Sequence, residues 1–434
     1  MVVFRVTENI NIKTTDGTLV KYYKLKKPSS LVNEAIYVST FEDFTSLKRV
    51  FLNVADKYRV RIIEETKIRD LAEFPKELGI SNLNEYSINK RLEYKYKDLN
   101  SNCSDGELRS MYLNEEQVNL DKQLEGTIKE DISIVIIGNL GNSISEMICA
   151  STALRHLNDK LKKRFRSIKL DIYLNASDNK YYSRDKSIFS NQNFVNKVSA
   201  LSINVKEMCE YDFFIDASSV SNRSYYSHLS YIDSWLYKFG IDYSKINNSE
   251  KYNTINISFF YPKKELKEKL SKLKQKGKTL LFHPYSANIE KSIPQESAKK
   301  LLNDLILKLP DYTIVSVLNL GSKFDTDRYV DLSSYSHGFL DYAFIVSNMD
   351  KIITVNTATY HIADAFFIPT LTILTDSKKN KNIQVYSNSK TIYVKDKSKN
   401  FSNFIFQADS LILYKFEAWS KLKTSRIIKL LETF

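Results

Sequence analysis

The sequence predicts an α/β fold class, with two doubly wound domains in tandem behind an accessory α+β region. Apolar runs rich in β-branched residues, such as ISIVIIG (132–138) and TLLFHP (279–284), are typical of parallel strands buried on both faces. Amphipathic stretches alternate with them, as in βαβ units. A chain of 434 residues exceeds what one hydrophobic core usually supports. The expected parts are an accessory region (1–130), a first α/β domain (131–262), a second α/β domain (263–415) and a terminal helix (416–434).

The accessory region has the alternating patterns of short strands. VVFRV (2–6) and LVKYYKL (19–25) flank the turn TTDGT, which predicts a hairpin. DKYRVRIIEE (56–65) is typical of another strand. The segment 71–123 is rich in polar residues, and we expect short helices or loops there. No motif in this region indicates a chemistry.

The first α/β domain begins with the strand ISIVIIG, the turn NLGNS (139–143) and a helical pattern over 144–163. Later strands are expected at IKLDIYL (168–174) and YDFFIDAS (211–218). Apolar strands separated by helical or polar segments predict a parallel sheet covered by helices.

The second α/β domain repeats this pattern. A helix with leucines on one stripe and solvated lysines elsewhere is expected over 263–278, before the strand at 279–284. Ser292 is expected to cap the next helix, with Pro294 in its first turn and Gln295 at the capping-box position. Further strands are expected at 312–318, 351–356 and 370–374. The amphipathic terminal helix is expected to pack back on the first domain, anchored by Trp419.

Composition narrows the class of protein. The hydrophobic fraction of 43% and charged fraction of 26% are typical of a globular protein. No apolar run approaches the roughly 20 residues of a membrane span, and no signal-peptide pattern opens the chain. We therefore expect a cytoplasmic protein. The cysteines lack CxxC spacing, the five histidines lie far apart and no Asp-x-Asp motif ends a strand, so no metal and no cofactor are expected.

The formal charge of +13 is spread along the chain. A positive surface attracts polyanions. The chain carries no nucleic-acid-binding motif, which excludes nucleic acid as an expected partner. We expect instead a peripheral association with anionic lipid on the inner face of the membrane, or an anionic glycolipid acceptor.

Polar turns follow several of the expected strands. They are NLGNS, HPYSAN (283–288) and NTATYH (356–361), and ligands of open α/β sheets bind at such strand ends. The third turn leads directly into a helix, whose first amides and dipole can bind phosphate oxygens. Thr357 and Thr359 can add hydroxyl donors. The alternative for Thr357 is that it only caps this helix.

The motifs together resemble those of bacterial heptosyltransferases, inverting glycosyltransferases of the GT-B architecture that use ADP-heptose. The similarity covers Asp131 to Leu374 and has four parts in order: IVIIGNLGNSISEMICASTALRHL, YDFFIDAS, LLFHPYSANIEKSIPQE and VNTATYHIADAFFIPTLTIL. The resemblance implies two facing Rossmann-like domains. An extra β-rich region before the first βα unit is similar to the layout of autotransporter heptosyltransferases, which modify protein serines.

The resemblance implies metal-independent, inverting transfer of a sugar from a nucleotide-diphosphate donor. The acceptor would be a hydroxyl of a surface glycan such as lipopolysaccharide, of a lipid-linked sugar or of a protein. Ser286 and Lys291 match positions that contact the donor phosphates, and Lys291 would neutralise the departing pyrophosphate. The other substrate-binding candidates are His283, Asn356, Thr357, Ala358, Thr359 and His361, with Gly141, Asn142 and Glu146 on the acceptor side. His361 is otherwise a structural histidine.

The sequence departs from the family at several site positions. The family has an Asp after the glycine of the first turn, where this chain has Asn142, and an amide cannot act as the base. Glu146 either replaces that base or is a solvated surface residue. Asn356, Ala358 and Tyr285 stand where the family has Asp, Gly and Gly. An alternative function is therefore a catalytically inactive relative that serves as a binding or assembly module in a glycosylation complex.

Overall fold

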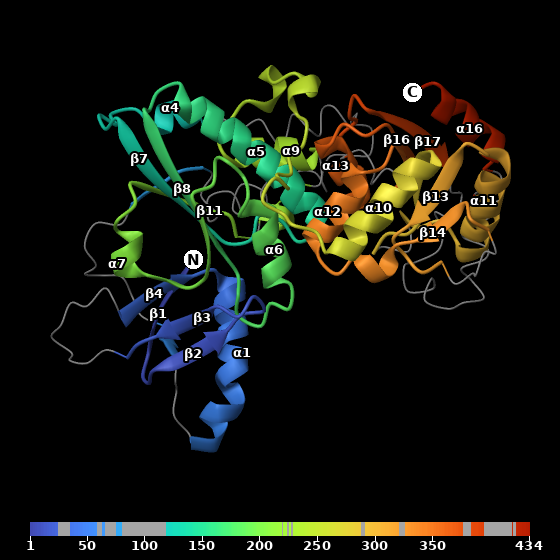
Figure 1. Cartoon of the computed structure of the whole chain (residues 1–434). Helices are drawn as coiled ribbons and strands as arrows, with labels where there is room; N and C mark the ends of the chain where they lie inside the picture. The colour runs from blue at the N-terminus through green and yellow to red at the C-terminus, as the bar shows by residue number, and fades with distance from the viewer. Residues whose placement is uncertain are drawn as a thin grey trace, which may run out of the picture. The chain divides into compact units, whose positions relative to one another are not determined.

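The computed structural model divides into two compact units, Met1–Ile246 and Asn247–Phe434, which we describe separately (Figure 1). The described residues are 1–24, 35–58, 63–65, 75–79, 119–218, 220–223, 225–226, 229–287, 291–320, 326–375, 383–394, 419 and 422–434. Within this part of the chain, none of the helices combines the length and the apolar content that a membrane-spanning helix needs.

The first unit is built on a five-stranded sheet in the order β6-β11-β7-β8-β9. All neighbouring strands are parallel. Their bounds are β6 Lys76–Glu77, β7 Asp131–Ile137, β8 Ser167–Leu174, β9 Lys197–Ala200 and β11 Phe213–Asp216. The predicted strands at 132–138, 168–174 and 211–218 are thus confirmed, and the side chains from Ile134 to Ile137 are fully buried.

Helices cover this sheet. Their bounds are α4 Leu120–Gln123, α5 Ile144–Lys162, α6 Tyr182–Phe189, α7 Val205–Met208 and α9 Tyr231–Lys238. The helix predicted over 144–163 is confirmed as α5, which contacts α6, α9 and β8. Eleven of its residues are buried, because it lies between the sheet and other helices.

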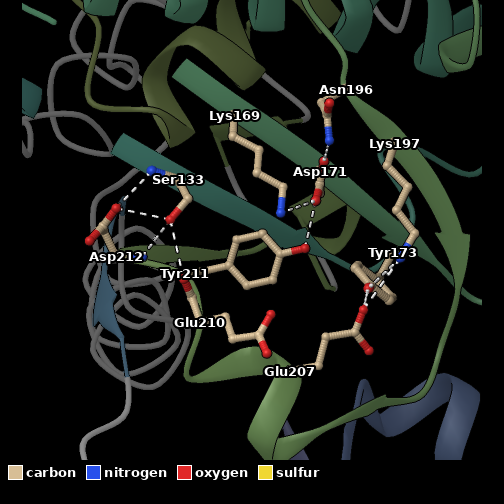
Figure 2. A network of polar contacts seen from close by, with 10 residues as sticks. All are labelled: Ser133, Lys169, Asp171, Tyr173, Asn196, Lys197, Glu207, Glu210, Tyr211 and Asp212. Carbon is tan, nitrogen blue, oxygen red and sulfur yellow. Dashed lines mark hydrogen bonds and ion pairs between the residues drawn. The ribbon is translucent and has the colours of Figure 1, made fainter. Parts of the chain in front are cut away.

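One face of β8 carries a polar network (Figure 2). Asp171 lies in the middle of the strand and is fully buried. Its carboxylate accepts hydrogen bonds from the Tyr211 hydroxyl (2.6 Å) and from the Asn196 amide (2.7 Å), and Lys169 lies 3.6 Å away. A buried carboxylate is tolerated when it is paired and hydrogen-bonded in this way. Burial, and then the neighbouring Asp171, raise the pKa of Tyr211.

The accessory region belongs to the same compact unit. Strands β1 (Val2–Val6), β4 (Ile36–Ser39) and β5 (Ile63–Glu65) form an antiparallel sheet, to which β10 (Ile203–Asn204) adds itself beside β4. Val3 and Val38 share a hydrophobic core with Val135 and Ile137 of β7. The accessory sheet therefore folds against the first α/β sheet.

The predicted hairpin forms around the turn TTDGT, with a different first strand. Strand β2 (Ile10–Lys13) pairs with β3 (Leu19–Tyr22), whereas Val2–Val6 joins the other sheet because Phe4 and Val6 are buried in its core. The predicted strand over 56–65 is wrong in its first part. The helix α1 (Phe41–Tyr58) extends to Tyr58, and only Ile63–Glu65 is extended among the described residues.

The second unit contains a six-stranded parallel sheet in the order β14-β13-β12-β15-β16-β17. Its strands are β12 Lys278–His283, β13 Tyr312–Ser316, β14 Tyr329–Asp331, β15 Lys351–Val355, β16 Thr370–Thr375 and β17 Ser389–Val394. Its helices are α10 Lys264–Lys276, α11 Gln295–Lys308, α12 Phe339–Ser347, α13 Ala358–Ala365 and α16 Thr424–Glu432. Each strand predicted for this domain is present. The leucine stripe of α10 is buried as expected.

Two local predictions in this unit need correction. The helix α11 begins at Gln295 with Pro294 at its N-cap, and Ser292 does not cap it. The Ser292 hydroxyl instead bonds the backbone of Ser286. The terminal helix α16 was expected on the first domain. Trp419 and the buried face of α16 lie instead in the core of the second unit, and α16 contacts α11 and β16. The predicted α/β fold class is confirmed by the two parallel sheets.

Candidate functional site

A buried hydrogen-bond network lies at the carboxyl end of β12 in the second unit. His283 is the last residue of that strand, and its Nδ1 atom lies 2.5 Å from the Tyr342 hydroxyl and 2.7 Å from the Thr359 hydroxyl. The two hydroxyls also bond each other. The network therefore joins the end of β12 to α12 and to the first turn of α13. Sequence reasoning missed Tyr342, which lies in an apolar helix with no recognisable motif.

Both histidines of this region are held neutral. Burial lowers the pKa of His283 to about 4. Burial, and then the charge of Lys291, lower the pKa of His361 to about 3, and its Nδ1 atom lies 2.7 Å from the Tyr386 hydroxyl. A neutral imidazole can orient neighbouring hydroxyl groups, and it carries no charge that would offset a phosphate.

The start of α13 follows β15 directly. Thr357 occupies the N-cap position in an extended conformation (φ −150°, ψ 175°), but its side chain makes no capping hydrogen bond. Asn356, Thr357 and Ala358 are half-buried. The first amides of an α-helix have no intrahelical acceptor and carry partial positive charge. The turn thus presents backbone donors and the Thr357 hydroxyl together.

Lys291 lies near α13 in the second unit. Its ammonium is near enough to His361, one turn into α13, to lower the pKa of that imidazole. Ser292 closes the preceding turn: its Oγ accepts from the Ser286 amide at 2.9 Å and donates to the Ser286 carbonyl at 3.1 Å. Because β12 and β15 are adjacent and parallel, the turns after them lie at one edge of the sheet.

In the first unit, Gly141 shapes the turn after β7. Its φ is +119°, and a Cβ atom placed there would lie 2.6 Å from the Cβ of Glu146. This space lets the Glu146 side chain fold back over the start of α5. Its carboxylate accepts hydrogen bonds from the Asn142 amide (2.9 Å), the Ser143 hydroxyl (3.2 Å) and the Tyr226 hydroxyl (3.1 Å).

Glu146 thus has a capping role that neither sequence interpretation included. Ser143, the N-cap of α5, accepts from the Glu146 amide in return, so the two residues bond each other at the start of the helix. The Glu146 side chain is half-buried and held by three donors. Asn142 is exposed, and its side-chain amide donates to the Ser221 hydroxyl at 2.7 Å.

A polar cavity of about 280 Å³ adjoins this turn in the first unit. Gly141 and Asn142 line it, together with Asn139 and with Asn175 from the loop after β8. Sequence reasoning missed every lining residue except Gly141 and Asn142. Of the other predicted residues, Glu146 holds the turn, and Ser286, Lys291, Thr357 and the histidines belong to the second unit.

Asp43 of α1 also lines the cavity and holds the loop after β8. One of its oxygens accepts from the amides of Ala176 and Ser177, both at 2.8 Å, and the other from the hydroxyls of Ser39 and Ser177. Burial raises the pKa of this carboxyl group. The sequence contains a signal for the residue, because Thr40 to Asp43 matches the capping-box spacing and the Thr40 hydroxyl accepts from the Asp43 amide.

Among the described residues, no group of three or more His, Cys, Asp or Glu side chains is arranged to hold a metal ion. Comparison with known proteins gave structural similarities alone. No protein-family model and no curated protein matches the sequence.

The similar solved structures include glycosyltransferases and a putative UDP-N-acetylglucosamine 2-epimerase from Listeria monocytogenes. One is a glycosyl transferase family 9 protein from Veillonella parvula DSM 2008, with 11% identity and a TM-score of 0.48 over 70% of this chain and 98% of that chain. Another is the E. coli ADP-heptose lps heptosyltransferase II, with 10% identity and a TM-score of 0.47 over the same shares. A third is the iron-containing dodecameric glycosyltransferase TibC from enterotoxigenic E. coli H10407, with 10% identity and a TM-score of 0.44 over 70% and 76% of the two chains.

Proposed function

We propose that this protein transfers a sugar from a nucleotide-diphosphate donor to a hydroxyl group of an acceptor. The observation that supports the proposal is the position of Lys291 near His361, one turn into α13, together with a helix start that follows one of two adjacent parallel strands. A cation beside unpaired helix amides is suited to a pyrophosphate.

In this reaction the acceptor oxygen attacks the anomeric carbon while the bond from that carbon to the pyrophosphate oxygen breaks. Attack on the face opposite the leaving group inverts the anomeric configuration. Negative charge develops on the departing nucleotide diphosphate. The Lys291 ammonium, the first amides of α13 and the Thr357 hydroxyl would stabilise it without a metal ion, while Ser286 adds a donor from the turn after β12.

The acceptor side of the proposal lies in the first unit, at Gly141, Asn142 and Glu146. The proton of the acceptor hydroxyl must pass to a base, and Asn142 cannot accept it. For Glu146 to do so, the acceptor must reach a carboxylate that already accepts three hydrogen bonds. A Glu146→Gln variant separates the two roles, because glutamine can keep the capping contacts and cannot accept the proton.

Substrates and surroundings complete the proposal. The resemblance implies a nucleotide-diphosphate heptose or hexose as donor and no separate cofactor, and a surface glycan, lipid-linked sugar or protein as acceptor. A nucleic-acid partner is not part of the proposal, because the sequence carries no nucleic-acid-binding motif. The net charge of +13 would favour binding to the anionic inner face of a membrane.

A second candidate function is a binding or assembly module without turnover. It is favoured by Asn142 and Asn356, which stand where the resemblance leads one to expect acids, and by the engaged carboxylate of Glu146. Binding of a nucleotide diphosphate without hydrolysis or transfer of any nucleotide sugar would favour the module.

The decisive experiment for the donor site is Lys291→Ala, with binding of ADP, GDP and UDP followed by calorimetry. We expect loss of about 2 kcal/mol, roughly a 30-fold weaker affinity, because a charge-assisted contact to phosphate is removed. Lys267→Ala, an exposed lysine of α10, is the matched control and should bind like the wild type. Equal affinity in the Lys291 variant and the wild type would contradict the proposed phosphate site.

A further inference from the structure

The cavity of the first unit is assembled from three parts of the chain. Glu42, Asp43 and Ser46 come from α1 of the accessory region. Asn139 and Asn175 come from the loops after β7 and β8, and other lining residues come from the start of α6. The site is therefore at the carboxyl ends of parallel strands, where α/β sheets bind ligands, and one wall is supplied by the accessory region.

Two side-chain amides of the cavity have defined orientations. The Asn139 oxygen accepts from the Asn175 backbone amide at 3.0 Å, and the Asn175 oxygen accepts from the Thr40 hydroxyl at 2.9 Å. With both oxygens engaged, each NH₂ group is left as a donor, and neither makes a hydrogen bond within the described part of the chain. The exposed carboxylate of Asp178 adds acceptors to the same cavity.

An aromatic ring and a guanidinium group complete the wall at α6. Arg184 donates two hydrogen bonds to Asp185, at 2.8 and 2.6 Å, and its guanidinium lies 4.3 Å from the centre of the Tyr181 ring. The Tyr181 side chain is 59% exposed. The ring is thus held in place by its neighbour while much of its surface stays open to a ligand.

The charges of the wall select the class of ligand. Four acidic side chains (Glu42, Asp43, Asp178, Asp185) line the cavity with one guanidinium, and the exposed ones are Glu42 and Asp178. Such a wall repels a phosphate or carboxylate ligand. Fixed NH₂ donors beside carboxylate acceptors suit hydroxyl groups, because each hydroxyl donates and accepts. An exposed ring can cover the apolar C–H face of a sugar.

We propose that this cavity binds an uncharged carbohydrate, and that α1 of the accessory region forms part of the binding site. The inference rests on the proposed function for one point, that the bound sugar is the acceptor. It differs from the anionic glycolipid expected from net charge, because the local charge of the cavity is opposite in sign to that of the whole chain.

The test uses the full-length protein on an array of neutral glycans and of phosphorylated or uronate-containing glycans. We expect binding to at least one neutral glycan, with Tyr181→Ala and Asp178→Asn each weakening it by about tenfold, as loss of one good contact does. Asparagine tolerates the positive φ of residue 178 (+54°), so that variant removes charge without adding backbone strain. Tyr23→Ala is the matched control, since Tyr23 is similarly exposed (54%) in the same unit and does not line the cavity.

Three results would overturn the inference: binding confined to anionic glycans, binding that both cavity variants leave unchanged, or binding to no glycan. Failure of the transferase proposal is recognised separately. The cavity variants should keep the wild-type affinity for ADP, GDP and UDP. A protein that binds a neutral glycan and no nucleotide retains the carbohydrate site and loses the proposed donor site.

Discussion

His283 and His361 are the buried histidines of the second unit, and their environments explain why neither acts as a proton donor at neutral pH. The Nδ1 atom of His283 lies within hydrogen-bond distance of hydroxyl groups of α12 and α13, and His361 lies against Tyr386 and near the charge of Lys291. Each imidazole can therefore orient other groups of the donor side while it stays uncharged. They contribute to the site by orienting neighbouring groups.

These two histidines predict a pH-dependent stability. An unfolded histidine titrates near pH 6.5, whereas the folded pKa values are about 4 and about 3. Between these values the unfolded chain binds more protons, so the free energy of unfolding decreases as the pH falls below 6.5. For His283 the fall in pKa corresponds to about 3 kcal/mol, present above pH 6.5 and lost toward pH 4.

Urea unfolding across pH 4 to 7 measures this effect in the wild type and in His361→Asn. The variant lacks one titrating group, so the number of protons taken up on unfolding should fall by up to one. Its free energy of unfolding should therefore depend less steeply on pH. His337→Asn is the control, because the His337 side chain is exposed. Parallel curves for the wild type and His361→Asn would show that this imidazole does not titrate on unfolding.

Among the elements, the turn between β7 and α5 depends on one glycine. Gly141→Ala places a Cβ atom 2.6 Å from that of Glu146 at a φ of +119°. We expect a loss of about 1–3 kcal/mol in the free energy of unfolding, because a strained backbone and a steric clash combine. Gly126→Ala is the matched control, with a φ of +82° and nothing within 4 Å of the added atom.

The difference between the two glycine variants isolates the clash, since both adopt a positive φ. It is measured by chemical denaturation of each purified variant. Equal losses would mean that Glu146 moves aside at no cost, and that its hydrogen bonds contribute little to this turn.

Element boundaries were predicted well where the apolar pattern was long, and less well where several segments could pair with the same strand. The strand at 132–138 and the leucine stripe of α10 follow from periodicity alone. Ile10–Lys13 pairs with Leu19–Tyr22, because Val2–Val6, the other candidate partner, pairs with β4 in the other sheet. Ser292 fits a capping spacing, yet its hydroxyl bonds the Ser286 turn.

For the molecule as a whole, the two units are predicted to respond to different ligands. Hydrogen exchange with ADP, GDP or UDP should show slower exchange at 284–287, 291–293 and 356–360 in the second unit, because bound ligand suppresses local opening. A neutral glycan should slow exchange at 39–46 and 175–178 in the first unit. Protection of 175–178 by a nucleotide alone would contradict this division.

The accessory region is joined to the α/β part of the first unit by long-range contacts. Strand β10, from within the α/β part, pairs with β4, and Asp43 of α1 bonds the loop after β8. These contacts join residues more than 130 positions apart in the chain, and they make α1 part of the cavity wall.

Local patterns sufficed for the fold class, most strands and the helix start at Thr357, because periodicity and turn chemistry act between near neighbours. The tertiary structure alone revealed Tyr342, the bonds from Asp43 to the loop after β8 and the polar cavity, and it assigned α16 to the second unit. An amphipathic helix shows that one face is buried but not what covers it. A buried carboxylate is likewise identified only when the distant amides that bond it are in place.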